Sequence, residues 1–555
     1  MKIVKALLAG VLLVSTLFGQ PVISSDGVVS AASYVPTGFV HSGIARGSFF
    51  SVFGQGLGPA TGQLVPSLPL PVALGGTSIR VTVGATTVDA LIHFTSATQV
   101  NAVLPSRTPA GDGTLTVTYG GRTSAAAPIH VVNRSFGIFT RNMAGRGPAI
   151  VQNFVSPTQQ PLNALSTSAQ TGQVAILWGT GLGPISGDDS VAPTPGNLTS
   201  DVQVLVGGKS ASILYAGRSP QFPGIDQINF QVPETAAGCY VPIALKVEGV
   251  IGNYGTMAIN PTGGTCSDPT TMSAADLNAV ASNGSAKIGL VYLSRMRAQG
   301  DLEVKVDEAR AAFYQRTIDQ LNASPYMYEY GTSLGTCLTY TRHVSNGEYD
   351  AIPEDTVNRI GLNAGSVMHL NGPQGAKQLT LTSPGWFDIT TIGGGFGGTT
   401  LPEYLVPGHY TADNGTGGAD VGSFTATLDL QPTLSWTNQD SVSSINRARD
   451  LTVRWTGGDP EKEFVVIVGL SVDATSQILG SFVCAERPAA GQFTVPASIL
   501  SHLPVTTPWT GDGFPTATLT VATQPLAATA KFAAPGLDAA YFTYAAQNVA
   551  LVNFN

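Results

Sequence analysis

Charged residues are scarce in this chain of 555 residues, and their scarcity argues against one large class of function. Lys and Arg number 27 and Asp and Glu number 35, so charged residues make up 11% of the chain, against about 25% in an average soluble domain. The basic residues are few and scattered, whereas contact with phosphates needs clustered Lys and Arg. We therefore expect no nucleic-acid partner.

Several sequence motifs of catalysis and metal binding are also absent. The seven histidines form no HExxH or HxH motif, and the four cysteines form no CxxC pair. These absences argue against a metallohydrolase, a structural zinc site and a thioredoxin-type redox centre. A GxSxG match surrounds Ser333, but a nucleophile elbow needs a helix after the serine. Because a strand is predicted there, we interpret the match as a glycine-rich turn.

Long hydrophobic runs are missing apart from one at the N-terminus. Two lysines precede an apolar run at residues 6–18, which suits a signal-peptide core and is short for a membrane span. Small residues allow cleavage after Ser24 or Ala31, and we assign residues 1–31 to a signal peptide. A buried N-terminal helix and an uncleaved anchor are the alternatives. We expect a secreted, cell-surface or periplasmic protein with no membrane span in the mature chain.

The cysteines are few but even in number, namely Cys239, Cys266, Cys337 and Cys484. In an oxidising compartment two disulfides are expected, and four cysteines allow three connectivities. We favour Cys239–Cys266, which closes a short loop within one domain, and Cys337–Cys484, which ties two distant β segments together. Four free buried thiols are the alternative.

Glycine and proline are abundant, with 65 and 36 residues, and 43% of the chain is hydrophobic. This composition suits short strands and frequent turns around real cores. A chain of this length is expected to hold three to five domains.

One pair of motifs occurs twice in the same order. Residues 47–59 (GSFFSVFGQGLGP) match residues 172–184 (GQVAILWGTGLGP), and residues 99–105 (QVNAVLP) match residues 227–233 (QINFQVP). The two offsets are nearly equal, so the chain carries an internal repeat. The glycines after each strand allow positive φ, and the proline ends the strand.

The fold class that we predict is mainly β, because residues 114–119 alternate with period two and turn signals recur at short intervals. We expect tandem immunoglobulin-like β-sandwiches at residues 32–133 and 134–265, followed by further β-rich domains at residues 266–431 and 432–555. In the second sandwich we expect the side chains of three residues to be buried, namely Trp178, Phe230 and Val232.

The strand with its GxGLGP turn, the QINFQVP strand and the FGIFT segment at residues 136–140 resemble a known family. It is an uncharacterised (Solibacter-type) C-terminal repeat of secreted acidobacterial proteins, similar in outline to IPT/TIG immunoglobulin-like domains. The resemblance covers residues 34–261 in two copies and departs in the first copy, where QVNAVLP lacks the bulky Phe. It implies an immunoglobulin-like fold and brings no established activity.

The sequence pattern changes after Cys266, where a helix is predicted among the strands. Residues 273–281 predict a short helix with Ser273 as N-cap. Residues 301–321 suit either a helix or a strand, and we favour the strand because the surroundings read as β. A domain boundary is expected near Pro432. Further strands are expected at 379–382, 423–430, 451–455 and 464–469.

Asp413, Asn414 and Asp420 lie around glycines and offer the hard oxygen ligands that Ca²⁺ binds on tight loops. The segment lacks the Glu of an EF-hand and occurs only once. A plain turn, in which Asp and Asn bond to their own backbone, is the alternative that we favour. Asp188 and Asp189 are a weaker calcium candidate. No other cofactor is expected.

The sequence contains no assembled catalytic set. The leading hypothesis is an exported, non-enzymatic multi-domain β protein with an adhesion, ligand-binding or spacer role, whose partner is a carbohydrate or a protein surface. The alternative is a secreted esterase or glycosidase with its site in residues 266–555. A glycosidase needs two neighbouring carboxylates, and the candidates are Glu303, Asp307, Glu308, Glu354, Asp355 and Glu403.

Overall fold

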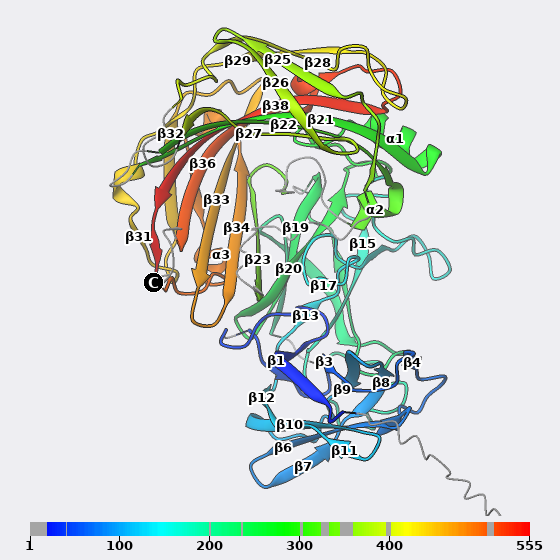
Figure 1. Cartoon of the computed structure of the whole chain (residues 1–555). Coiled ribbons are helices and arrows are strands. Elements are labelled where there is room, and N and C mark those ends of the chain that lie inside the picture. The colour runs from blue at the N-terminus through cyan, green and yellow to red at the C-terminus, as the bar shows by residue number, and fades with distance from the viewer. Residues whose placement is uncertain are drawn as a thin grey trace, which may run out of the picture.

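The computed structural model shows a chain built mainly of β-strands, as predicted. It describes residues 19–39, 41–198, 201–234, 237–299, 304–323, 332–343, 359–395, 401–507 and 516–555. The described strands group into three units. Figure 1 shows the first unit in blue at one end, the large sheet of the third unit in green to red at the other, and the second unit between them.

The first unit is a sandwich of two sheets. Its strands are β1 (Val22–Ser30), β2 (Ile44–Ala45), β3 (Phe49–Gln55), β4 (Gln63–Leu64), β5 (Ala73–Leu74), β6 (Thr77–Val83), β7 (Thr86–Asp89), β8 (Leu91–Thr95), β9 (Gln99–Val103), β10 (Gly111–Tyr119), β11 (Arg122–Thr123) and β12 (Ala127–Val132). Among the described residues, one sheet has the order β1-β3-β9-β8-β4 and the other β2-β12-β10-β6-β5, with β7 on β6 and β11 on β10. The alternation expected at residues 114–119 is present, since Leu115 and Val117 are fully buried.

Strand β1 lies within the segment that we assigned to the signal peptide. It pairs antiparallel with β3, and Val28 and Val29 are buried. Cleavage after Ser24 or Ala31 would remove hydrogen-bonded strand from this sheet. The pairing therefore disagrees with cleavage after Ser24 or Ala31, while the predicted signal-peptide core at residues 6–18 lies outside the described residues.

The second unit is a single sheet that curls around its own core. Its strands are β13 (Gly137–Ile138), β14 (Val151–Asn153), β15 (Val174–Thr180), β16 (Val202–Val206), β17 (Lys209–Arg218), β18 (Asp226–Gln231), β19 (Gly238–Val247) and β20 (Val250–Ile259). Within the described residues the order is β13-β15-β18-β17-β16-β19-β20, with β14 on β15. The long strand β17 pairs with β16 through its first half and with β18 through its second half.

The first two units share an order of strand pairing. Strand β3 pairs with β9, which pairs with β8, just as β15 pairs with β18, which pairs with β17. Glycines at matching positions share a left-handed backbone, with φ of 74° at Gly47 and 77° at Gly172. The units differ where β7 and β8 of the first correspond to the continuous β17 of the second, so only the second unit closes into one sheet.

The predicted burial of Trp178 is wrong, whereas Phe230 and Val232 are buried as expected. Alternation along β15 explains the difference, because Ala175 and Leu177 are the residues that face the core. Trp178 therefore points to the outer side of the sheet, where it is partly exposed.

The third unit is one large sheet with small sheets and helices against it. Its strands are β21 (Ser285–Gln299), β22 (Val304–Thr317), β23 (Thr336–His343), β24 (Ile360–Gly361), β25 (Val367–Gly372), β26 (Gly375–Ser383), β27 (Trp386–Gly395), β28 (Gly408–Asp413), β29 (Thr425–Leu430), β30 (Ser435–Trp436), β31 (Ser444–Ile445), β32 (Leu451–Thr456), β33 (Glu463–Asp473), β34 (Ile478–Glu486), β35 (Gln492–Val495), β36 (Ala517–Pro525), β37 (Lys531–Phe532), β38 (Ala539–Leu551) and β39 (Asn553–Phe554). Its helices are α1 (Ala274–Asn283), α2 (Ile318–Ala323), η1 (Gln439–Ser441), η2 (Pro488–Ala490), α3 (Ala497–Leu500) and α4 (Ala527–Ala530).

The large sheet crosses the domain boundary expected near Pro432. Among the described residues it has 14 strands, in the order β23-β34-β33-β36-β38-β21-β22-β27-β26-β25-β28-β29 with β24 on β22 and β37 on β38. Strand β38 pairs in parallel with β21, and β34 pairs with β23. Strands from both sides of Pro432 thus lie in one sheet, with β34, β33, β36 and β38 between β23 and β21, so the segments 266–431 and 432–555 form one unit.

The predicted elements after Cys266 are present. Helix α1 begins after Ser273, whose side chain accepts a hydrogen bond from the N–H of Asp276. The ambiguous segment 301–321 is mostly the strand β22 and ends in α2.

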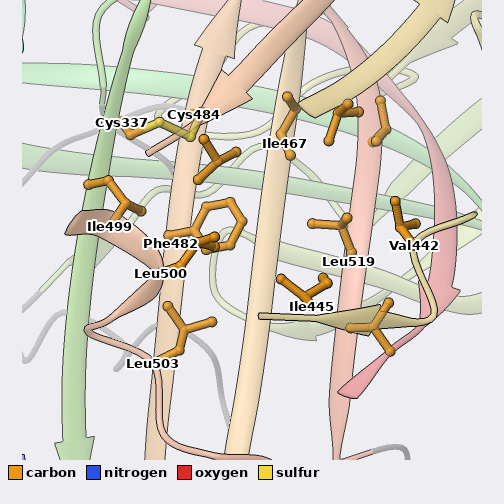
Figure 2. Close-up of a cluster of buried hydrophobic side chains, with 14 of the residues drawn as sticks. Cys337, Val442, Ile445, Ile467, Phe482, Cys484, Ile499, Leu500, Leu503 and Leu519 are labelled. Atoms are coloured by element: carbon orange, nitrogen blue, oxygen red, sulfur yellow. A yellow bond between two sulfur atoms is a disulfide. The ribbon is translucent and has the colours of Figure 1, made fainter. Parts of the chain in front are cut away.

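One core of the third unit lies between the large sheet and the small strands β30, β32 and β35. Figure 2 shows Phe482 of the large sheet near Leu500 of α3, Leu519 of the large sheet near Ile445 of β31, and the Cys337–Cys484 disulfide. All of these side chains are buried.

Candidate functional site

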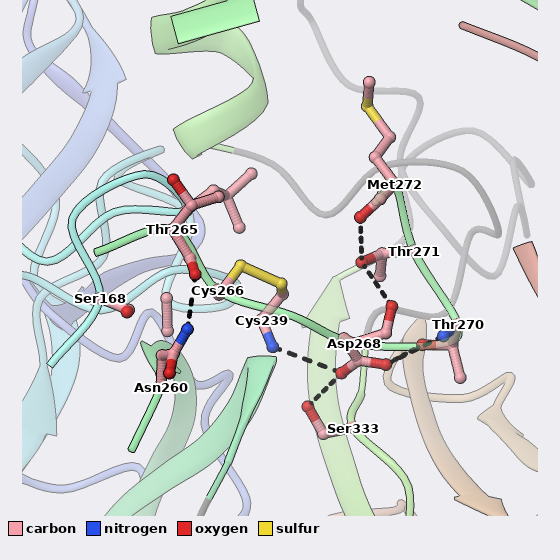
Figure 3. Close-up of a disulfide and its surroundings, with 12 residues drawn as sticks. Ser168, Cys239, Asn260, Thr265, Cys266, Asp268, Thr270, Thr271, Met272 and Ser333 are labelled. Atoms are coloured by element: carbon pink, nitrogen blue, oxygen red, sulfur yellow. Dashed lines mark hydrogen bonds between the residues drawn. A yellow bond between two sulfur atoms is a disulfide. The ribbon is translucent and has the colours of Figure 1, made fainter. Parts of the chain in front are cut away.

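The serine of the GxSxG match is a structural residue at the edge of the second unit. Ser333 is 2% exposed, and its hydroxyl donates to Oδ2 of Asp268 at 2.7 Å. Figure 3 shows the same carboxylate accepting from the N–H of Cys239 and from Thr270. Strand β23 follows, so the match is a turn before a strand, as interpreted.

Both favoured disulfides are present. Cys239 at the start of β19 is bonded to Cys266 beyond β20, with Cα atoms 5.2 Å apart. Cys337 and Cys484 are register partners in β23 and β34, with Cα atoms 4.0 Å apart. The first bond fastens the end of the second unit, and the second fastens an edge strand of the large sheet.

The candidate calcium ligands lie together in a hydrogen-bonded turn. Oδ1 of Asp413 accepts from the N–H of Gly415 at 3.0 Å and contacts His369 Nδ1 at 2.9 Å. The amide oxygen of Asn414, which is 1% exposed, accepts from the N–H of Phe424 at 2.9 Å.

The third candidate ligand, Asp420, accepts from the N–H of Asn363 at 2.8 Å. Side-chain oxygens of all three candidates thus accept hydrogen bonds from backbone N–H groups, one from within the turn and two from the neighbouring residues Phe424 and Asn363. Within the described residues, no three His, Cys, Asp or Glu side chains form a group that could hold a metal ion. Calcium binding at this turn stays a prediction.

Two of the glycosidase candidates meet on the large sheet, where cations surround them. The carboxylate of Asp307 accepts two hydrogen bonds of 2.7 Å from the guanidinium of Arg295 and two more from backbone N–H groups. Glu403 lies 3.3 Å from Arg295, 3.2 Å from Arg297 and 3.3 Å from Lys305.

The charges around Glu403 are wrong for a general acid. Partial burial raises its pKa, but the three cations outweigh burial and hold the pKa of this carboxyl below its ordinary value. A glycosidase acid needs the opposite shift. Glu308 contacts Arg310 at 3.4 Å, and the other candidates, Glu303, Glu354 and Asp355, lie outside the described residues.

The first and second units meet at the GTGLGP turn that follows β15. The hydroxyl of Thr180 accepts from the N–H of Phe49 in β3 at 2.9 Å and donates to the carbonyl of Gly224 at 2.6 Å. Thr180 is fully buried. A hydroxyl of the second unit thus satisfies the backbone of both units.

Beside Thr180 lies a buried ion pair of Arg218 and Asp226, with side chains 1% and 0% exposed. Arg218 also donates to the carbonyl of Gly183 at 2.6 Å, and Asp226 accepts from the N–H of Leu182 at 2.7 Å. Burial raises the pKa of Asp226, while the Arg218 guanidinium and the backbone N–H groups oppose this shift. The pair fixes the turn that the first unit contacts.

On the first unit, Ser106 is the matching contact. Its N–H and its hydroxyl donate to the two carboxylate oxygens of Asp189 at 2.6 and 2.7 Å, and Arg46 donates to its carbonyl. An open cavity of about 750 Å³ lies here, within the range of ligand pockets. Its lining is Arg46, Leu91, Pro105, Ser106, Arg107, Pro184, Ile185, Ser186, Gly187, Asp188 and Asp189.

All three units meet around two buried histidines. The ring of His41, before β2, lies 4.3 Å from that of His502, after α3, and Tyr254 of β20 packs edge-on against His502 at 5.4 Å. Burial lowers the pKa of His502 to about 4 and that of His41 well below its ordinary value. Both rings are therefore neutral at pH 7.

Edge strand β23 adds two contacts between the units. Nε2 of His343 lies 3.7 Å from Asp26 of β1, and Arg146 lies over the ring of Tyr340 at 5.2 Å from its centroid. The strand that the second disulfide holds is thus the one that faces the first two units.

Of the junction residues, only Asp189 stood out in the sequence, and it did so as a weaker calcium candidate rather than as a contact between units. Arg218 and Asp226 lie shortly before the QINFQVP motif at residues 227–233. Charged residues are rare in this chain, and this rarity is the one sequence signal that points to the two residues. Nothing in the sequence pairs His41 with His502, because residues so far apart are joined only by the fold. None of the helices formed by the described residues is long and apolar enough to cross a membrane.

Comparison with known proteins gives no family. No family model and no curated protein matches the chain. Among solved structures, the extracellular region of plexin A4 is 12% identical over 43% of this chain with a TM-score of 0.17, and the chain spans 18% of that region.

Two further structures are similar at the same level. Domains 5–6 of the S-layer protein SbsC are 14% identical, with 44% of this chain and 99% of that one covered and a TM-score of 0.17. Chicken CNTN1 FN1–FN3 domains are 9% identical, with 92% and 94% covered and a TM-score of 0.14. These TM-scores are too low to carry an argument, and the architecture rests on the strand pairing alone.

Proposed function

We propose that the chain is an exported, non-enzymatic structural protein, a rigid spacer made of β units that are locked to one another. The observation that carries this proposal is the buried polar junction between the first and second units. Thr180 satisfies backbone groups of both, and Asp189 accepts two hydrogen bonds from Ser106.

Rigidity follows from how such junctions respond to separation. Domains joined by linkers with few contacts move by default. Here separation would break the hydrogen bond between the N–H of Phe49 and the hydroxyl of Thr180 and would open the site next to the buried Arg218–Asp226 pair. Each hydrogen bond of this kind contributes about 0.5–1.5 kcal/mol net of the bonds to water that replace it, so the contacts at the junction together favour the closed arrangement.

Export is part of the proposal. Disulfides persist in oxidising compartments, and all four cysteines are paired. The charged start and apolar run at residues 6–18 suit a signal peptide. A secreted or cell-surface location fits a spacer, and a periplasmic one is compatible with the same signal.

We further propose that the first two units are copies of one immunoglobulin-like repeat of the IPT/TIG type, as in the secreted acidobacterial proteins that they resemble. The shared order of strand pairing and the matching left-handed glycines Gly47 and Gly172 support this.

Small-angle X-ray scattering of the mature chain tests the spacer. We expect one rigid particle to account for the profile at all angles, and the Thr180→Val variant to widen the distance distribution. Thr427→Val, an exposed threonine on β29, is the matched control and should leave the profile unchanged. A wild-type profile that requires a broad ensemble of unit orientations would contradict the spacer.

The non-enzymatic part is tested with ester, glycan and peptide substrates. We expect no turnover, because Ser333 is buried and its hydroxyl is bonded to Asp268. Hydrolysis that disappears in Ser333→Ala would establish the hydrolase alternative instead.

A further inference from the structure

The outer face of the second unit's sheet carries a row of uncharged polar and aromatic side chains. Along β18, Ile228 and Phe230 are fully buried in the core, so Gln227 and Asn229 point to the other side. The register sets Trp178 of β15 opposite Gln227. It also sets Tyr215 of β17 opposite Asn229. All four outward side chains are partly exposed.

Hydrogen bonds hold these side chains in fixed orientations. Gln227 Nε2 donates to Asn229 Oδ1 at 2.9 Å, and Trp178 Nε1 donates to Gln152 Oε1 at 2.8 Å. The Tyr215 hydroxyl donates to the carbonyl of Arg218 at 2.7 Å. Within the described residues, no hydrogen bond uses the amide oxygen of Gln227 or the amide nitrogen of Asn229. One acceptor on Gln227 and one donor on Asn229 therefore keep their capacity to form hydrogen bonds.

The first unit contains the same amide pair. Gln99 Nε2 donates to Asn101 Oδ1 at 2.8 Å, and Phe53 is the register partner of Gln99. Core packing does not explain why two units keep this pair, since both pairs lie on the side of the sheet away from the core.

In the first unit, neighbouring residues occupy the surroundings of the Gln99–Asn101 amide pair. The hydroxyl of Ser51 also donates to Asn101, and the ring of Tyr34 lies 6.3 Å from that of Phe53. The amide pair that is open to a ligand is thus Gln227–Asn229 in the second unit.

We propose that this face, which is formed by Gln152, Trp178, Tyr215, Gln227 and Asn229, binds a neutral polysaccharide. Aromatic rings offer apolar surface to the C–H side of a sugar ring, and an amide oxygen beside an amide nitrogen suits neighbouring hydroxyls, which both donate and accept. None of the five side chains is charged, so the face offers no counter-charge to an anionic polymer.

The length of the face fits a chain of sugars rather than a single one. Two strand spacings and a rise of two residues separate Trp178 from Tyr215, which places their Cα atoms about 12 Å apart. That distance spans more than one sugar ring. Binding of this kind goes beyond the proposed spacer role, because a spacer needs no ligand.

Affinity electrophoresis of the mature chain tests the proposal. The probes are soluble neutral polysaccharides, namely a β-1,4-glucan, a β-1,3-glucan, an α-1,4-glucan, a xylan and a mannan. We expect at least one to retard the chain, and we expect Gln227→Ala/Asn229→Ala to weaken that retardation at least tenfold. Trp178→Ala should do the same, while Gln99→Ala/Asn101→Ala, the matched pair of the first unit, should leave retardation unchanged.

The thermal midpoint of each variant separates lost binding from lost folding, and Trp178→Phe, which keeps a ring, should retain most of the binding. Absence of retardation by all five polysaccharides would overturn the proposal, as would retardation that survives Gln227→Ala/Asn229→Ala. Small-angle scattering of the same samples reports on the spacer independently, so failure of one proposal is distinguishable from failure of the other.

Discussion

Gly47 and Gly172 occupy matching positions in the first two units and show how context decides the role of a residue. Both have a left-handed backbone, with φ of 74° and 77°. A Cβ at Gly47 would lie 2.7 Å from Ser106 Oγ and 2.8 Å from Arg218 Nη2, whereas a Cβ at Gly172 would meet nothing within 4 Å. Gly47 is therefore needed for its backbone and for its lack of a side chain, and Gly172 only for its backbone.

Substitution of the two glycines by alanine separates these effects. Gly172→Ala should destabilise the chain by about 1 kcal/mol, which is the penalty of a left-handed alanine. Gly47→Ala should add about 1–3 kcal/mol from overpacking at the junction. Midpoints of urea unfolding measure both, and equal shifts would show that the space around Gly47 is unimportant.

Substitution of Asp226 tests how much the buried Arg218–Asp226 ion pair at the same junction contributes to stability. Asp226→Ala leaves Arg218 buried without its partner, and we expect a loss of about 3–5 kcal/mol. Asp89→Ala is the matched control, because Asp89 pairs with Arg80 at 3.4 Å on the surface with side chains 49% and 67% exposed. An exposed pair contributes about 0–1 kcal/mol. Similar losses in the two variants would contradict the importance of burial.

The turn with Asp413, Asn414 and Asp420 allows a direct test of calcium. Backbone N–H groups of Gly415, Phe424 and Asn363 already bond to these side chains, so we expect the thermal midpoint to be the same in EDTA and in millimolar Ca²⁺. A midpoint that rises with Ca²⁺ in the wild type but not in Asp413→Ala would establish a calcium site instead.

At the scale of elements, the two disulfides differ in what they constrain. Cys239–Cys266 closes 27 residues and Cys337–Cys484 closes 147. Chain entropy gives about 3–4 kcal/mol for the shorter loop and about 5 kcal/mol for the longer one. The longer bond also holds β23 against β34; within the part of the chain that the structure describes, β23 is an edge strand with one neighbour in the sheet.

Replacement of each pair by serine should therefore have unequal effects. Cys337→Ser/Cys484→Ser should lower the unfolding free energy more than Cys239→Ser/Cys266→Ser and should speed proteolysis of β23, since the strand loses its covalent attachment. Unfolding midpoints and mapped cleavage sites report the two effects. A larger loss in the shorter loop would contradict the entropic account.

Element type was predictable where side chains alternate or repeat. The strands β3, β15 and β18 follow from the duplicated motifs, and β10 follows from alternation at residues 114–119. Which side chains of β15 point to the core was not predictable. A large aromatic residue such as Trp178 suggests the core, but Ala175 and Leu177 are on the core side of the strand and Trp178 is on the other side. Its smaller neighbours fill the core instead.

The strand pairing of the large sheet could not be predicted from the sequence for a different reason. Parallel pairing of β21 with β38 joins residues about 250 positions apart, such as Ile288 and Ala539, and no local pattern encodes such a partner. Pro432 looked like a boundary because two strands meet there, yet strands on both sides enter one sheet.

The junction residues escaped prediction likewise, because their meaning depends on tertiary partners. Arg218 and His502 each read as isolated polar residues in the sequence. In the structure each is buried against a different part of the chain, which only the assembled units reveal.

At the scale of the whole molecule, the histidine junction links stability to pH. The pKa of His502 is lowered to about 4 and that of His41 is lowered well below 6.5, chiefly by burial. Tyr254, whose pKa burial raises to about 12, packs against His502. Arg447 donates to the carbonyl of Leu503, the residue after His502. Neither offers a negative charge at neutral pH.

Acid should therefore open this junction. An exposed histidine takes up a proton below about pH 6.5, whereas the buried rings stay neutral, so the open state gains stability as the pH falls from 6.5 toward 4. For His502 the shift in pKa corresponds to about 3 kcal/mol.

Unfolding midpoints should fall as the pH falls from 6.5 toward 4. The variant His41→Phe, which keeps an aromatic ring beside His502, should flatten this fall. His409→Phe, at an exposed histidine that pairs with Asp429, should not. A pH profile that is the same in the wild type and in His41→Phe would show that the pair does not couple the units to pH.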